Sequence, residues 1–117
     1  MLAVGEHLWG RVDDHIMRMT SGLAGGLGCD YQELCGTVSG GALLIGSVYG
    51  RTSPEEDDEE CNRRVNLYRE RFLQAFGTTR CYDIREQGYG GDGQWPCSTL
   101  VERAARILLG VLSEPVP

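Results

Sequence analysis

The chain has 117 residues, with 17 acidic and 11 basic side chains and a formal net charge of −6. This length suits one domain, which can bury about two-thirds of its extended surface without disulfide cross-links. The net negative charge provides no basic surface to attract nucleic acid or anionic lipid, so we expect neither nucleic acid nor a membrane as a partner.

The first half of the chain reads as helices separated by glycine. Apolar spacing predicts a first helix that ends at Gly10 and a second over about residues 13–23. The glycines of residues 25–28 follow the last periodic residue, which is the usual place for a helix to stop. No segment shows a convincing alternating strand pattern.

A third helix is predicted over about residues 31–49, and its interior is rich in glycine, including Gly36, Gly40 and Gly46. Each interior glycine costs up to about 1 kcal/mol relative to alanine. We therefore expect something to approach this helix closely. It is either another helix, which includes a second copy in a homodimer, or a cofactor that contacts Gly36 and Gly40.

The second half begins with a capping signature in which Ser53 precedes Pro54 and Glu56, so a fourth helix is predicted to start there with the acidic residues 55–60. Its core-facing stripe consists of Cys61, Val65, Tyr68, Phe72 and Phe76. Gly77 ends it, and the glycines of residues 88–93 predict a loop. A last helix is predicted over residues 99–112, with Thr99 and Glu102 as a second capping pair. The expected fold is all-α, a single small bundle of four to five helices over residues 1–117.

Five cysteines carry the clearest chemical signal. Residues 1–9 lack a basic leader, and the longest apolar run, residues 42–49, is too short to span a bilayer, so the expected compartment is the reducing cytoplasm. An odd number of cysteines there indicates metal ligation, reactive thiols or burial rather than a disulfide framework. No Cys-x-x-Cys motif is present, and His7 and His15 have no second ligand four residues away on the same face.

A thiol acts as its thiolate, and the start of a helix favours an anion by about 0.3–1 kcal/mol. Cys35 and Cys97 fall near the starts of the third and last predicted helices. Cys81 precedes Cys97 by sixteen residues, across a glycine-rich loop that can bring the two together. Cys61 is expected to be structural, since it lies on the apolar stripe. Cys29 is a loop thiol that reaches Cys35 only if the glycine turn doubles back.

Several segments resemble the C_GCAxxG_C_C family of redox-active proteins. They are SGLAGGLG at residues 21–28, LCGTVSGGALLIG at residues 34–46 and the Tyr-Gly pair at residues 49–50. The resemblance covers about residues 12–112 and also includes a cysteine before a variable loop and one that opens the last helix. It implies that Cys35, Cys81 and Cys97 act in thiol redox chemistry, or hold an iron–sulfur cluster or a metal such as zinc. Thr37 replaces the alanine of the motif, and the family's N-terminal cysteine element is missing.

The sequence thus predicts that Cys35, Cys81 and Cys97 converge at one end of the bundle, and three functions remain open. In the first, Cys81 and Cys97 form a reversible disulfide and Cys35 is the exchanging thiol, or the roles are permuted, and the partner is a redox protein or a small thiol. In the second, the three thiolates bind iron–sulfur, zinc or copper(I). In the third, the chain is a helical association module with incidental thiols.

Overall fold

The computed structural model describes residues 1–116. Within them the chain forms six α-helices and one 3-10 helix, and no strand beyond two isolated bridges: α1 (Leu2–Trp9), α2 (Asp14–Thr20), η1 (Ser21–Leu23), α3 (Gly36–Tyr49), α4 (Glu59–Phe76), α5 (Cys81–Glu86) and α6 (Cys97–Ser113). The predicted all-α fold class is confirmed. None of the helices in the described part of the chain has the length and apolar character needed to cross a membrane.

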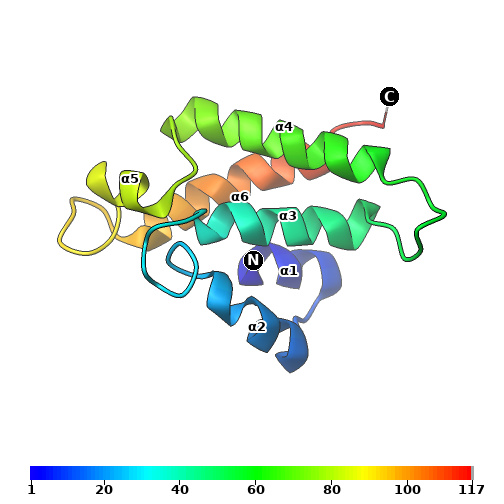
Figure 1. Cartoon of the computed structure of the whole chain (residues 1–117), viewed down its shortest axis with the longest axis horizontal. Coiled ribbons are helices and arrows are strands. Elements are labelled where there is room, and N and C mark those ends of the chain that lie inside the picture. The colour runs from blue at the N-terminus through cyan, green and yellow to red at the C-terminus, as the bar shows by residue number, and fades with distance from the viewer. Residues whose placement is uncertain (117) are drawn as a thin grey trace.

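Three long helices, α3, α4 and α6, pack against one another and enclose the core, while α1 and α2 cover one side of it (Figure 1). Figure 1 shows that α3 and α6 begin at the same end of the bundle, where α4 finishes and the short α5 lies. This alternation of direction is what short connections between neighbouring helices produce. It brings three segments that are far apart in the sequence to one end of the molecule.

The predicted glycine stops are confirmed at Gly10 and Gly77, which end α1 and α4 with φ angles of 77° and 75°. Glycine has no Cβ to resist this left-handed conformation, and its N–H closes the last turn of the helix. At the start of α2 the side chain of Asp13 accepts a hydrogen bond of 3.0 Å from the backbone N–H of Ile16. This bond satisfies an N–H that the helix itself leaves free.

The predicted start of the third helix near residue 31 is wrong, since α3 begins at Gly36. The preceding residues run antiparallel to the segment after α4. The backbone N–H of Cys35 donates to the carbonyl oxygen of Thr79 at 2.7 Å, and that of Cys81 donates to the carbonyl of Glu33 at 2.9 Å. These long-range bonds hold the backbone extended where apolar spacing alone predicted a helix.

The predicted helix start at Ser53 and Pro54 is also wrong. The hydroxyl of Ser53 bonds the carboxylate of Glu55 at 2.9 Å instead of capping a helix, and α4 begins only at Glu59. The side chain of Arg51 donates to the carbonyl oxygen of Pro54, which holds this segment as a turn.

The second half of the chain differs from its prediction in two further places. The α6 helix starts at Cys97 with Pro96 as its N-cap residue, so Thr99 and Glu102 lie inside the helix and form no capping box. The segment predicted to be loop contains the helix α5, Cys81–Glu86. Sequence reasoning missed α5 because the glycines that follow it dominate the local pattern.

The apolar stripe of α4 faces the core as predicted, with Tyr68, Phe72 and Phe76 buried and Cys61 and Val65 partly buried. The partial burial of Cys61 in the core agrees with its predicted structural role.

Arg64 is a buried cation that the stripe did not predict. Its side chain is completely buried, donates to the carbonyl oxygens of Val111 at 2.6 Å and Glu114 at 2.7 Å, and pairs with Glu60. The guanidinium also lies 4.2 Å from the centre of the Tyr49 ring. Arg64 therefore donates to carbonyl groups at the C-terminal end of α6, where the helix itself supplies few backbone donors.

Candidate functional site

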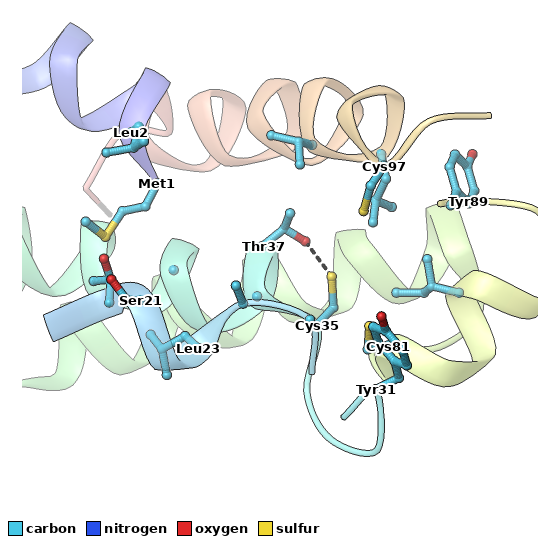
Figure 2. A pocket seen from close by; sticks show the side chains of 18 of the residues that line it. Met1, Leu2, Ser21, Leu23, Tyr31, Cys35, Thr37, Cys81, Tyr89 and Cys97 are labelled. Carbon is cyan, nitrogen blue, oxygen red and sulfur yellow. Dashed lines mark hydrogen bonds between the residues drawn. The ribbon is translucent and has the colours of Figure 1, made fainter. Parts of the chain in front are cut away.

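A cavity of about 550 Å³ lies where α3, α5 and α6 begin (Figure 2). All three cysteines singled out from the sequence, Cys35, Cys81 and Cys97, line it. Gly36 and Gly40 line it as well. The structure thus brings together side chains that lie 62 positions apart at the extremes.

Each of the three cysteines stands at the start of a helix. Cys35 is the N-cap residue of α3, Cys81 is the first residue of α5 and Cys97 is the first residue of α6. Because α4 runs in the opposite direction to α3 and α6, all three starts fall at the same end of the bundle. Figure 2 shows the sulfur of Cys35 between Cys81 and Cys97 in that view.

Cys35 and Cys81 are held on neighbouring extended segments, through the isolated bridge between Leu34 and Arg80. Since side chains alternate along an extended segment, Cys35 and Cys81 project to the same side of this pair as diagonal neighbours. Diagonal neighbours have Cα atoms about 7–8 Å apart, close to the upper limit of about 7 Å for a disulfide. A modest backbone movement therefore separates this arrangement from a cross-link.

The three thiols differ in access to solvent. Cys35 is buried, with 5% of its surface exposed, Cys81 is partly buried and Cys97 is exposed. A hydrogen bond of 3.0 Å joins the Cys35 sulfur to the hydroxyl of Thr37, and the Tyr68 hydroxyl donates to the Thr37 carbonyl at 2.8 Å. The innermost thiol is thereby fixed in position, whereas Cys97 is open to an incoming molecule.

Two of the three thiols, Cys81 and Cys97, have a raised pKa. Although the Cys97 residue is exposed, neighbouring protein atoms partly shield its sulfur from water and raise its pKa above the ordinary value. The negative charge of Cys35 raises this pKa further, and the guanidinium of Arg85 lowers it. Burial likewise raises the pKa of Cys81, followed by the charges of Cys35 and Cys97, and Arg85 again opposes the rise. Cys35 is therefore close enough to influence the pKa of both Cys81 and Cys97, and the single cation Arg85 lowers the pKa of both.

Arg85 also lines the cavity, and the sequence analysis did not single it out. It lies one turn after Cys81 in α5, and its guanidinium stacks 4.0 Å from the centre of the Tyr31 ring. A Cβ atom at Gly91 would lie 2.7 Å from the Arg85 Nη2 atom and one at Gly90 3.0 Å from Nη1, so a larger residue at either position would displace the end of this side chain. The four-residue spacing from Cys81 is visible in the sequence, but it has meaning only once this segment is known to be a helix.

The chain matches the family model described as "Putative redox-active protein (C_GCAxxG_C_C)" over residues 1–111. It belongs to this family. The family description supports a redox role for the chain. No curated protein and no solved structure matches it.

In this C_GCAxxG_C_C protein the other two cysteines lie outside the cavity lining. Cys61 packs at the edge of the core, and Cys29 is exposed on the loop before α3. The glycine turn does double back, since a Cβ atom at Gly26 would meet the Cys81 Cβ at 2.6 Å. Cys29 comes near enough for its charge to contribute to the raised pKa of Cys81.

The glycines of α3 have different roles. A Cβ atom at Gly36 would lie 3.1 Å from the carbonyl oxygen of Leu23, and one at Gly40 3.4 Å from the Cβ of Met1. Close packing within the chain thus accounts for both positions, although each also borders the cavity. Gly46, by contrast, has open space beside it. Of the three glycines on which the homodimer prediction was based, Gly36, Gly40 and Gly46, it is the one that faces outward.

A metal centre was the second function predicted from these cysteines. Among residues 1–116, no three His, Cys, Asp or Glu side chains are grouped closely enough to hold a metal ion. The thiols in this arrangement do not form a ligand set for one ion, and we assign no step to a metal.

Proposed function

We propose that this C_GCAxxG_C_C protein carries out thiol–disulfide exchange in the cavity, with Cys97 as the attacking thiol and Cys35 or Cys81 as the resolving thiol. The observation that carries the proposal is that three cysteines from distant segments line one cavity, each at a helix start. Among the permutations that the sequence left open, the exposure of Cys97 and the burial of Cys35 favour Cys97 as the first to react.

In the first step the Cys97 thiolate attacks one sulfur of a substrate disulfide. A protein–substrate disulfide forms, the substrate disulfide breaks, and the other half of the substrate leaves as a thiolate. In the second step the resolving thiolate attacks the Cys97 sulfur, an internal disulfide forms, and the second half of the substrate leaves. The protein loses two electrons and the substrate disulfide gains them; a dithiol reductant reverses the change in the protein.

The surroundings of Cys97 support its role as the nucleophile, because two features stabilise its thiolate. Cys97 is the first residue of the 17-residue helix α6, whose free N–H groups favour negative charge, and the Arg85 guanidinium lowers its pKa. Burial acts in the opposite direction and raises the pKa. The attacking thiol is therefore expected to react faster as the pH rises, because more of it becomes thiolate.

The test is reaction with 2-hydroxyethyl disulfide, a small uncharged substrate, followed by mass spectrometry. We expect wild-type protein to lose two hydrogen atoms and to form a disulfide between two cavity cysteines. Cys97→Ser should abolish this product. Whichever of Cys35→Ser and Cys81→Ser removes the resolving thiol should accumulate the protein–substrate disulfide. Cys29→Ser and Cys61→Ser, which change thiols outside the cavity, should react like wild type.

Three results would count against the proposal. If Cys97→Ser forms the internal disulfide at the wild-type rate, Cys97 is not the attacking thiol. If the purified protein contains iron or zinc in stoichiometric amount, and the triple serine variant of the cavity cysteines loses it, the metal-binding function replaces thiol exchange. If that triple variant behaves like wild type in every cellular assay, the association module is favoured.

A further inference from the structure

The charge of the cavity is opposite to that of the protein. The chain carries a net charge of −6, yet within residues 1–116 the charged side chains that line the cavity are Arg18 and Arg85, and no carboxylate lines it. A concave site lined by one sign of charge concentrates ligands of the other sign. The cavity therefore attracts anions, although the protein as a whole repels them.

Arg85 is held in place but has no partner of opposite charge. Among the described residues it forms no salt bridge, whereas six other arginines do. Its guanidinium is confined between the Tyr31 ring and the backbone of Gly90 and Gly91, which fixes its direction without using its hydrogen-bond donors. A planar guanidinium with free donors is suited to binding a carboxylate through two parallel hydrogen bonds.

The rest of the lining is mostly apolar and suits a small organic molecule. Leu23, Ile84, Leu100 and Val101 contribute aliphatic side chains, and the volume of about 550 Å³ is within the range of sites for small ligands. Arg18 belongs to α2 and Arg85 to α5, so the two cations stand on different walls. The geometry thus offers a charged group at more than one point around an apolar centre.

We propose that the substrate of this cavity is a small, carboxylate-bearing organic disulfide, with a carboxylate bound by Arg85 and the sulfur–sulfur bond beside Cys97. This inference rests on the proposed exchange function and adds the substrate class. Arg18 provides long-range attraction for a second carboxylate. The apolar side chains cover the carbon chain of the substrate and exclude water from the reacting sulfurs.

The experiment compares three disulfides of similar size. They are 3,3′-dithiodipropionate, which is anionic, 2-hydroxyethyl disulfide, which is neutral, and cystamine, which is cationic. Each rate of reaction with the protein is divided by the rate of the same disulfide with 2-mercaptoethanol, so that intrinsic reactivity cancels. We expect the anionic disulfide to exceed the cationic one by roughly tenfold or more, and the preference to shrink as salt is added.

Substitutions of single arginines test which side chain causes the preference for the anionic disulfide. Arg85→Gln should remove most of it, and Arg85→Lys should keep part of it because the charge remains. Arg106→Gln makes the same charge change on an exposed arginine of α6, paired with Glu102, and should leave the preference unchanged. Octanedioate, in which methylenes replace the two sulfurs of dithiodipropionate, provides a readout without chemistry. Calorimetry should detect its binding to wild type and roughly tenfold weaker binding to Arg85→Gln.

The outcomes separate this inference from the proposed function. Equal normalised rates for the three disulfides would overturn the substrate class and leave thiol exchange intact. If no disulfide reacts but octanedioate binds through Arg85, exchange fails and the anion site stands. If octanedioate binds wild type and Arg85→Gln equally well, the assignment of Arg85 is wrong.

Discussion

Replacing Arg64 with methionine tests how the bundle holds its C-terminal helix. Methionine keeps much of the side-chain volume but removes the donors to the carbonyl oxygens of Val111 and Glu114 and the pairing with Glu60. Hydrogen bonds from a charged group contribute about 1.5–3 kcal/mol each, so the two carbonyl bonds together represent about 3–6 kcal/mol. We expect Arg64→Met to lower the free energy of unfolding by about 3–5 kcal/mol.

Urea denaturation followed by circular dichroism measures this change, and thermal melting should show the midpoint falling by about 12–20 °C. Arg63→Met is the matched control. Arg63 is the next residue and pairs with the same Glu60 at 2.7 Å, but it is far more exposed than Arg64. An exposed pair is screened by solvent and contributes little to the free energy of unfolding. If the two variants lose the same stability, the buried carbonyl bonds contribute little and the reasoning fails.

Three further predictions concern Cys97, two glycines of α3, and Glu60. The rate of alkylation of Cys97 by iodoacetamide should keep rising above pH 9.0, because burial raises the pKa of this thiol. The midpoint of the pH–rate curve should be higher in folded than in urea-unfolded protein, and equal midpoints would contradict the prediction. Gly41→Ala should destabilise the protein by about 1–3 kcal/mol, because the new Cβ would lie 2.3 Å from a ring carbon of Tyr68. Gly46→Ala has open space beside it and should be neutral or stabilising by up to about 1 kcal/mol. Chemical denaturation of both variants measures the difference. The hydrogen bond from Arg63 is the main cause that lowers the pKa of Glu60 to about 2. Wild type should therefore lose stability as the pH falls from 4.5 to about 2, and Glu60→Gln should lose less over the same range. Measuring the stability of both proteins across an acid titration tests this prediction.

The helices were predictable where local chemistry decides them. Gly10 and Gly77 end their helices because a left-handed residue is needed there, and glycine signals that need in the sequence. The start of α3 was not predictable, because the long-range bond from Cys35 to Thr79 competes with the helix. Ser53 satisfied a capping pattern, yet its hydroxyl found a nearer acceptor in Glu55.

The cysteines of the site were predicted by the family resemblance, while their surroundings were not. Arg85 takes its position from α5, a helix hidden by the glycines that follow, and from its stacking on Tyr31, which lies far away in the sequence. Within residues 1–116 the cavity lining contains no carboxylate, and only the folded structure shows this. The acidic overall composition would instead suggest a negatively charged cavity.

The two ends of α6 are mechanically connected. A helix of 17 residues is about 25 Å long and nearly rigid, with Cys97 at one tip and the carbonyl groups bound by Arg64 at the other. A tilt of about 5° about the anchored tip would carry the thiol roughly 2 Å, which is enough to misalign an in-line attack. If the proposed exchange takes place at Cys97, substitutions beside the anchor will slow it without altering any atom of the cavity.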